Sequence, residues 1–520
     1  MSGGHASERS MIHAEAFLAR ITQAFAFVGV VTMLVIAVIT SLDVLILRAL
    51  LNRPIAGSNE LTQTIFSVGI AAVLASGLAQ RANLRVDVLS DLVGQRTKSW
   101  ITAAGSLVTA SLLVVLGWRV FDQASTSMLR HSQTIILELP LAPFQYAISA
   151  LIWLCVPVQV LVTMRDCVTA AGEGSAIGRA QRSVIGCLVL LSALVVVALA
   201  GTALIYGATL GLQSIGRADP VLVGGILFVM IWVLVLAMVP VGVALACVGV
   251  VGTAAIIGVP AALKVLGSET TALFSSVELA LIPLFLMMGS FAVVSGLSED
   301  VYRFSQAVLG PFRGGLAMAT IGGSAGFGAL TGSSIATAVT IGSIGLPEMR
   351  KRGYDGGFSA GCVAAGATLG VLIPPSTIVV LYGVLTEQSI GKLYIAILVP
   401  GLISVIGYLA TIWIIVRLRA DLAPDPEVFS LRELIWSFRR SLAMFVLFGL
   451  VIGGIFFGVF TPTEAAAVGA VLSFIIALAR GAIRGDRIWS IAAETTQSVA
   501  MIYVLIMGAL LAAYFFALTG

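Results

Sequence analysis

Apolar runs of roughly 20 residues, the length at which a helix crosses a bilayer, recur along this chain and limit its fold more than any other feature. Only 10% of its 520 residues are charged, whereas an average soluble domain carries about 25%. So few charges cannot cover a compact body of this size, which excludes a water-soluble enzyme. The sequence therefore predicts an all-α polytopic membrane protein.

The apolar segments and the basic residues between them predict the course of the chain through the membrane. Nine Lys and Arg residues flank the first five spans on the side of the N-terminus, and five lie on the other side. Because positive charge favours the cytoplasmic side, this bias predicts a cytoplasmic N-terminus. The predicted spans lie near residues 24–47, 61–80, 100–118, 142–164, 184–210, 221–239, 241–263, 275–297, 392–418, 440–460 and 463–480.

Two polar breaks divide the predicted spans into modules. Ala171–Arg182 is short, charged and rich in glycine, and Gln213–Pro220 is a second polar break. Such composition is typical of linkers. We therefore predict a four-span small module (residues 1–170), a linker with one extra crossing helix (171–220) and a large module (221–520). The extra crossing lets both modules keep their own orientations within one chain.

Part of the large module, Gly310–Ser376, is rich in glycine, with 16 glycines among 67 residues. Within it, Gly314–Met349 carries two apolar stretches on either side of the polar turn Thr331–Ser334. Each stretch is shorter than the roughly 20 residues that a comfortable crossing needs. The pattern predicts a helical hairpin that enters the membrane and returns, with its tip at Thr331–Ser334.

A second segment, Gly361–Gly383, has Pro374 and Pro375 in its middle. Two prolines remove two backbone donors and push the preceding residue out of the α region, so we expect two half-helices with an unwound joint at Gly370–Ser376. Secondary transporters use such breaks to bind coupling cations and anionic substrate groups. The alternative is that the glycines only allow close helix packing and the prolines only kink one helix.

Five stretches of the chain resemble the membrane component of tripartite ATP-independent periplasmic (TRAP) transporters, in the form that fuses the small and large subunits. Three of them are similar to the large subunit: Gly328–Ala338, Thr368–Ser376 and Gly458–Ala470. Two are similar to the small subunit: Asn52–Leu61 and Arg81–Leu89. The likeness covers nearly the whole chain.

The resemblance implies both a fold and a function. The fold has a stator made of the small subunit and scaffold helices, and an elevator-type transport domain with two re-entrant hairpins and two broken helices. The function is sodium-coupled import of an organic acid, a C4-dicarboxylate or a related carboxylate, delivered by a periplasmic substrate-binding protein. The chain is then a bacterial inner-membrane transporter in contact with lipid, not an enzyme, with sodium ions for coupling and no cofactor. Asn83 departs from the family, which commonly has a histidine there.

The resemblance also carries over a candidate site where the hairpin tip meets the broken helix. Hydroxyl and carbonyl oxygens suit a hard monovalent cation without any formal charge, so no metal other than sodium is expected. The candidate sodium ligands are the hydroxyls of Thr331, Ser333 and Ser334 and the backbone carbonyls of Gly370, Ile373 and Pro375. The candidate substrate-binding residues are Ser334, Ser376 and Thr377.

Several acidic residues near the predicted spans have structural interpretations. Thr461–Glu464 (TPTE) predicts a capping box, with Thr at the N-cap, Pro at N1 and Glu at N3. Glu60, just before the second span, is interpreted as a helix N-terminal charge or a subunit contact rather than a proton carrier. Asp43 lies in the first span, and Arg48 follows five residues later, which predicts a structural pair rather than a proton relay.

Three other functions fit the sequence less well. A channel filter relies on symmetric repetition of one loop, and an intramembrane enzyme needs a paired acid, a Ser–Lys dyad or a metal set within its spans; the sequence has neither. A sodium–dicarboxylate symporter without a binding protein is the nearest alternative, and the four-span small module argues against it. No G-x-x-x-x-G-K-[ST] motif indicates ATP binding, and the net charge of +4 does not indicate a nucleic-acid partner.

The C-terminal segment predicts an incomplete second repeat. Spans at 440–460 and 463–480 open a second unit, and Ser498–Gly520 resembles the first arm of a second hairpin with Leu518–Gly520 at its tip. Because such folds are built from inverted repeats, a returning arm, a second broken helix and a terminal span are expected beyond it. The sequence alone therefore favours a truncated chain, and a non-functional fragment stays open as an alternative.

Overall fold

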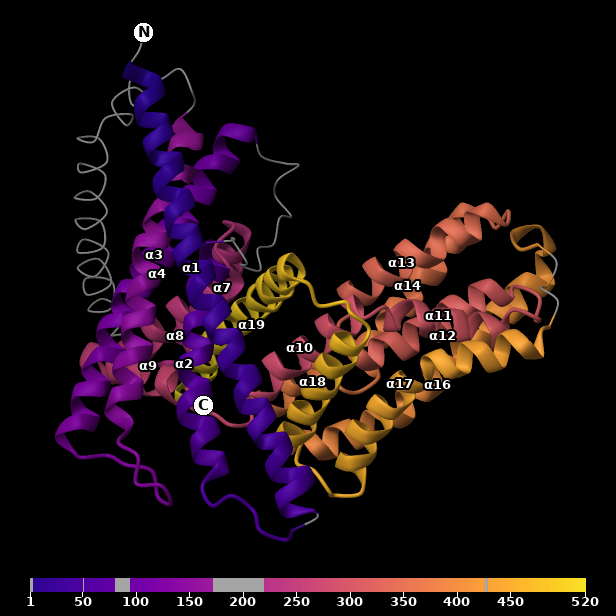
Figure 1. The fold of residues 1–520 in the computed structure, drawn as a ribbon. Helices are drawn as coiled ribbons and strands as arrows, with labels where there is room; N and C mark the ends of the chain where they lie inside the picture. The colour runs from indigo at the N-terminus through magenta and orange to yellow at the C-terminus, as the bar shows by residue number, and fades with distance from the viewer. Residues whose placement is uncertain (1–2, 50, 80–93, 172–218, 425, 427–428) are drawn as a thin grey trace. The chain divides into compact units, whose positions relative to one another are not determined.

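The structure, a computed structural model, describes residues 3–49, 51–79, 94–171, 219–424, 426 and 429–520. The motif Arg81–Leu89 with Asn83, most of the linker and the predicted span 184–210 lie outside these residues. All regular elements in the described part are helical, apart from an isolated bridge between Gln133 and Pro140. The predicted all-α architecture is confirmed (Figure 1).

Eight helices of the described chain are long and apolar enough to cross a membrane. Seven of them correspond to predicted spans, and the eighth, Arg487–Thr519, includes most of the segment that was predicted as a hairpin arm. The eight helices lie at Arg20–Arg48, Ser58–Leu78, Thr97–Leu129, Leu141–Cys167, Ile390–Leu418, Leu431–Phe456, Pro462–Ala479 and Arg487–Thr519. On the third of them, Trp100 and Trp118 are 55% and 61% exposed. They lie about 27 Å apart along the axis, close to the hydrocarbon thickness of about 30 Å, as interfacial tryptophans do.

The chain forms two compact units, and their boundaries differ from those of the predicted modules. Unit 1 comprises Met1–Thr32, Asn59–Ser276 and Ala492–Gly520, and unit 2 comprises Met33–Ser58 and Val277–Ile491. The start of the large module is therefore grouped with most of the small module, and the end of the first span is grouped with the hairpin region.

Unit 1 is built around the long helices of the small module. Its helices are the first part of α1 (Gly3–Leu42), nearly all of α2 (Ser58–Ala79), α3 (Gln95–Leu129), α4 (Leu141–Ala171), α7 (Pro220–Leu236), α8 (Val241–Ile257), α9 (Val259–Phe274) and most of α19 (Gly485–Thr519). Helix α3 packs along α4 (Figure 1). Val223 and Leu227 of α7, Val248 of α8 and Phe515 of α19 share one buried apolar cluster.

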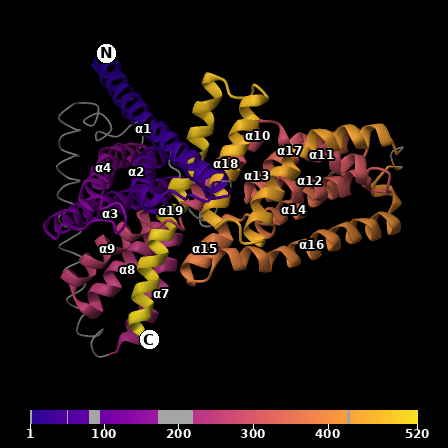
Figure 2. The same ribbon diagram turned by 60° about the horizontal axis from the view of Figure 1, so that its bottom comes forward.

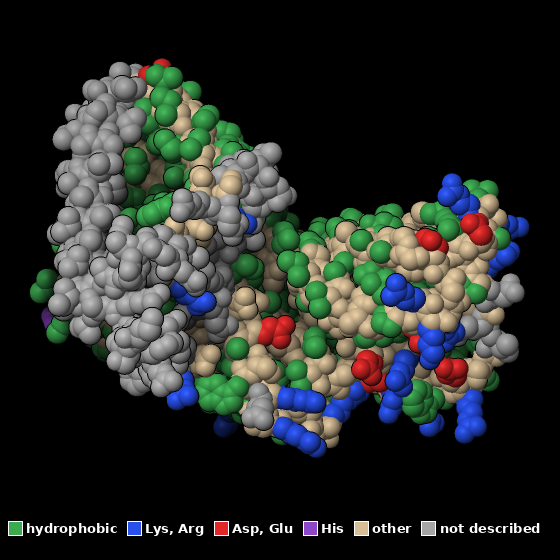
Figure 3. Space-filling model, turned by 90° about the horizontal axis from the view of Figure 1, so that it is seen from above, with side chains coloured by type: hydrophobic (Ala, Val, Ile, Leu, Met, Phe, Trp, Pro, Cys, Tyr) green, Lys and Arg blue, Asp and Glu red, His purple; other side chains and the backbone are tan. Residues whose placement is uncertain are grey.

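Unit 2 holds the hairpin region. After the end of α1 and a π-helical segment, Asp43–Arg48, it contains α10 (Leu281–Val294), α11 (Leu297–Leu309), α12 (Gly315–Thr331), α13 (Ser334–Lys351), α14 (Gly356–Leu372), α15 (Thr377–Leu385), α16 (Ile390–Leu418), α17 (Leu431–Phe456) and α18 (Pro462–Ala479). Helix α12 packs against α11, α13 and α14, and α15 lies beside α16 (Figure 2). In Figure 3, Lys and Arg side chains are most numerous along the lower edge and at the right-hand end of the visible face, and hydrophobic side chains lie among them.

Three predicted segments have different courses in the structure. The span 275–297 is shorter than predicted, because residues 275–280 are not helical and α10 covers only Leu281–Val294 before the chain turns at Gly296 (φ +77°) and meets α11 at 69°. The span 241–263 is also interrupted, since α8 ends at Ile257 and Gly258 (φ +92°) precedes Pro260 at the start of α9. Each of these left-handed glycines follows the end of a helix. Ser498–Gly520 forms no separate arm, because it continues α19.

Candidate functional site

The predicted helical hairpin is present, and its tip has a local cause. Helix α12 ends at Thr331, and Gly332 follows in the left-handed region (φ +61°), with its N–H donating to the Gly328 carbonyl at 2.8 Å. Ser333 is the N-cap of α13 and its hydroxyl accepts from the Ala336 N–H at 3.3 Å. A glycine that ends one helix and a serine that caps the next turn the chain within two residues.

The predicted helix break is also present and is shorter than expected. Helix α14 continues to Leu372, and α15 starts at Thr377 with a bend of 43°. Gly370 therefore belongs to α14, whereas Ile373–Ser376, here called the break, is non-helical. The peptide bond between the two prolines is cis. Since prolines have no N–H, the carbonyl of Gly370 cannot receive its helical hydrogen bond from residue 374.

The structure brings the hairpin tip against the break. The position that a Cβ of Gly328 would occupy is 2.6 Å from the Gly370 Cα, so α12 and α14 touch through their backbones. The Thr377 hydroxyl donates to the Gly332 carbonyl at 3.3 Å. A Cβ at Gly370 would lie 2.9 Å from the Ser333 carbonyl oxygen. All predicted site residues lie on these two adjoining segments.

A residue that the sequence analysis missed completes the tip. Thr337 is fully buried, and its hydroxyl donates to the Ser333 carbonyl at 2.7 Å. The same hydroxyl oxygen lies 3.5 Å from that of Thr331, which donates to the Phe327 carbonyl at 3.3 Å. Thr337 lies one helical turn after Ser333, and that spacing on α13 is the signal that identifies it.

The predicted residues differ in how far they are exposed. Ser333, Ser334 and Thr377 are half-buried, whereas Thr331 and the break residues are buried. Ser376 is 1% exposed, and its hydroxyl has no hydrogen-bond partner. The Ser376 carbonyl accepts from the Tyr394 hydroxyl at 3.4 Å. A buried hydroxyl without a partner is uncommon, and it leaves the Ser376 oxygen available to a ligand.

The site is electrically neutral, because none of the candidate residues carries a charge. It offers hydroxyl and carbonyl oxygens, and the N-termini of α13 and α15 both begin there. Helix N-termini favour anions, and neutral oxygens suit a hard monovalent cation. In the described part of the chain, no group of three or more His, Cys, Asp or Glu side chains could hold a metal ion.

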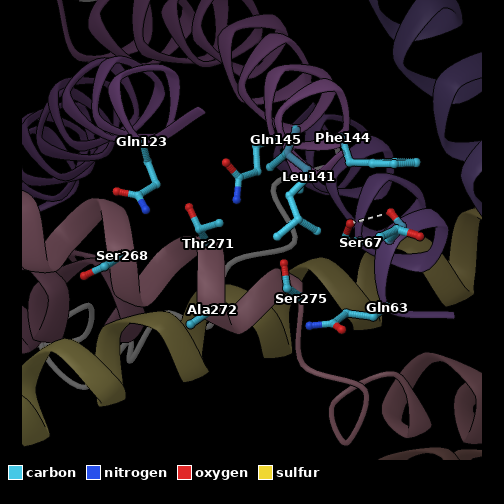
Figure 4. Close-up of a pocket in the computed structure, with 12 residues that line it drawn as sticks. Gln63, Ser67, Gln123, Leu141, Phe144, Gln145, Ser268, Thr271, Ala272 and Ser275 are labelled. Carbon is cyan, nitrogen blue, oxygen red and sulfur yellow. Dashed lines mark hydrogen bonds between the residues drawn. The ribbon is translucent and has the colours of Figure 1, made fainter. Parts of the chain in front are cut away.

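A separate cavity of about 250 Å³ lies within unit 1, between α2, α3, α4 and α9 (Figure 4). Its lining is polar and uncharged, with Gln63, Gln123, Gln145, Ser268 and Thr271 among the residues around it. The amide of Gln145 points into this space, and its oxygen has no hydrogen-bond partner. None of the predicted site residues lines it.

The structural interpretations of three acidic residues hold. The capping box is confirmed, because the Thr461 hydroxyl accepts from the Glu464 N–H and the Glu464 carboxylate accepts from the Thr461 N–H. Asp43 and Arg48 pair at 3.8 Å. Glu60 lies in the first turn of α2 and accepts hydrogen bonds from the backbone N–H groups of residues 135, 136 and 137. Its carboxylate therefore holds the loop between α3 and α4.

The fold and the candidate site define a class: a multi-pass all-α membrane protein in which a helical hairpin tip meets a proline-broken helix, as in secondary transporters. Family profiles agree. The "Tripartite ATP-independent periplasmic transporter, DctM component" profile matches residues 228–520, and the "Tripartite ATP-independent periplasmic transporters, DctQ component" profile matches residues 36–169. The chain belongs to the TRAP transporter family, as a permease that joins both membrane components.

Several curated proteins are similar to this chain. The C4-dicarboxylate TRAP transporter large permease protein DctM of Pseudomonas aeruginosa is 45% identical over 197 residues, which cover 38% of this chain and 46% of that protein. The isethionate TRAP transporter permease protein DctMQ of Oleidesulfovibrio alaskensis is 30% identical over 424 residues, 81% of this chain and 61% of that protein.

A third relative has another named substrate. The sialic acid TRAP transporter large permease protein SiaM of Vibrio cholerae is 31% identical over 228 residues, 44% of this chain and 53% of that protein. The chain thus spans about half the length of the curated relatives it matches. The family and the apolar helices make it a multi-pass inner-membrane protein, and these relatives are permeases.

Proposed function

We propose that the chain is the membrane component of a sodium-coupled secondary transporter that imports organic acids. The observation that carries the proposal is the meeting of the hairpin tip with the helix break, where the Thr377 hydroxyl donates to the Gly332 carbonyl. Two half-helices and unwound backbone at one place are the means by which secondary transporters bind coupling ions and substrate.

The proposed sodium site uses the tip and the carbonyls next to the break. Its ligands are drawn from the hydroxyls of Thr331, Ser333 and Ser334 and the carbonyls of Gly370, Ile373 and Pro375. The neutral oxygens, and the helical hydrogen bond that the Gly370 carbonyl cannot receive from a proline, support this choice. Thr337 holds the Ser333 carbonyl at 2.7 Å and so positions the tip.

The proposed substrate is a C4-dicarboxylate or a related carboxylate. Ser334, Ser376 and Thr377 lie at the N-termini of α13 and α15, where the helix dipoles favour an anionic group. The unpartnered hydroxyl of Ser376 supports its inclusion. Relatives of this chain are named for C4-dicarboxylate, isethionate and sialic acid, all of them acids.

We further propose that a periplasmic substrate-binding protein delivers the acid and that the N-terminus of the chain is cytoplasmic. The match to the small component over residues 36–169 supports the tripartite arrangement over a symporter that works alone. Uptake into vesicles separates the two. Sodium-dependent uptake that needs the binding protein supports the proposal, whereas the same uptake without any soluble protein contradicts it.

Replacing Ser334 with alanine tests the sodium site. Losing one oxygen contact of about 0.5–1.5 kcal/mol is expected to raise the sodium concentration for half-maximal uptake by roughly 3- to 10-fold. The matched control is Ser343→Ala, on the exposed face of the same helix, where the hydroxyl donates to the Thr340 carbonyl. Equal sodium dependence in both variants and the unchanged chain would show that the tip binds no sodium.

The elevator-type movement also stays a proposal. The hairpin and the broken helix, Gly314–Gly383, lie in unit 2, whereas α3 and α4 lie in unit 1. We expect the distance between spin labels at Val339 of α13 and Met128 of α3, both exposed, to change on adding sodium and substrate. Labels at Met128 and Trp153 of α4 should keep their distance. A constant distance for the first pair under all conditions would contradict the elevator movement.

A further inference from the structure

Arg48 joins the two family components through a charge cluster in which both carboxylates are buried and the arginine side chain is 44% exposed. The pairing of Arg48 with Asp43 was predicted from the sequence, whereas its contact with Glu464 was not. Arg48 lies in the segment that matches the small component, and Glu464 lies in the segment that matches the large component. The Arg48 Nη1 atom is 2.8 Å from the Glu464 Oε1 atom. The two residues are 416 positions apart in sequence, yet both belong to unit 2.

The Glu464 carboxylate has two partners, one in each component. Its Oε2 atom accepts from the Thr461 N–H at 2.8 Å and so closes the capping box of α18, and its Oε1 atom receives Arg48. The Glu464 side chain is 9% exposed. A carboxylate this buried needs both a hydrogen bond and a cation, because its charge is removed from water.

The second carboxylate of the cluster comes from the first span. Asp43 is 1% exposed, its Oδ1 atom accepts from the Ile55 N–H at 2.6 Å, and its Oδ2 atom is 3.8 Å from the Arg48 Nη2 atom. One guanidinium thus serves two buried carboxylates, one that holds the turn after the first span and one that opens α18. Arginine suits this role because its planar fork carries several donors and stays charged.

We infer that Arg48 is a latch that fastens the end of the small component's first span to the N-terminus of α18 in the large component. Without its charge, the two buried carboxylates share no cation, so their mutual repulsion and the cost of unpaired buried charge favour protonation of one of them or its movement toward water. Either change weakens the hydrogen bond to the backbone amide. The latch is a positioning device and depends on neither sodium nor substrate, so its test is separate from that of the proposed function.

Hydrogen exchange of the full chain in lipid nanodiscs tests the latch at two amides. In the Arg48→Gln variant, exchange at the Ile55 and Thr461 amides is expected to rise at least about tenfold. The rise at Thr461 is diagnostic, because that amide belongs to the other component. The matched control is Arg53→Gln, an exposed arginine in the same turn, which should change neither amide.

A charge-neutral variant keeps the inference testable if Arg48→Gln does not fold. The triple change Asp43→Asn, Arg48→Gln, Glu464→Gln removes all three charges, and glutamine at N3 still serves a capping box. Exchange at both amides should then lie between those of the unchanged chain and Arg48→Gln, or match the unchanged chain. An unaltered Thr461 amide in folded Arg48→Gln, or a triple variant no better protected than the single one, overturns the latch.

Discussion

Replacing Gly332 with valine is expected to reduce uptake by at least about 100-fold, because it separates the hairpin tip from the helix break. Gly332 has a φ of +61°, and a Cβ there would collide with the Pro375 carbonyl oxygen and lie 3.2 Å from the Ser376 Cα. Both obstacles are backbone, which cannot swing aside as a side chain can. Left-handed strain and overpacking each cost about 1–3 kcal/mol. Initial uptake rates in proteoliposomes, at equal amounts of folded protein, measure the effect.

Gly353 provides the matched control for this substitution. It also has a positive φ, +83°, between α13 and α14, but a Cβ there would meet nothing within 4 Å. Gly353→Val therefore carries the strain without the collision and should retain most of the uptake. If both valine variants lost uptake equally, backbone strain would be the cause. If Gly332→Val transported normally, contact between tip and break would not be needed.

Replacing Arg480 with alanine is expected to lower the free energy of unfolding by about 3–5 kcal/mol, the cost of leaving a buried carboxylate without its partner. The Arg480 Nη1 atom is 2.6 Å from the Asp300 Oδ2 atom, and the Asp300 side chain is 8% exposed. Arg480 also donates to the carbonyls of Ser295 and Arg440, at 3.1 and 3.3 Å. One arginine therefore ties α11, the turn before it and α17 to the end of α18.

The exposed pair of Arg303 and Glu299 is the control for Arg480. These side chains are 51% and 62% exposed, and their charged atoms are 3.9 Å apart. Exposed pairs of this kind contribute at most about 1 kcal/mol, so Arg303→Ala should barely shift unfolding. Denaturant or thermal unfolding in one detergent compares the two variants. Similar losses for both would mean that the burial of Asp300 does not make its pair important.

The features that the sequence predicted correctly have short-range causes. The hairpin turn follows from Gly332 and Ser333, the helix break from the two prolines, and the start of α18 from its capping box. Each depends on hydrogen bonds within about one helical turn. The interruption at Gly258 escaped prediction, because a lone glycine inside an apolar run is common in membrane helices and does not by itself end one.

Sequence alone therefore determined that this chain is an all-α membrane protein with a hairpin and a broken helix. The length of an apolar segment, and the hydrogen-bond donors and acceptors at a turn or a helix break, depend only on residues that are adjacent in sequence. The tertiary structure alone decided that the tip rests on the break, that Thr337 belongs to it, and that Arg48 reaches Glu464 across 416 positions. Such contacts depend on backbone approach and on the burial of charge, which arise only once distant helices pack together.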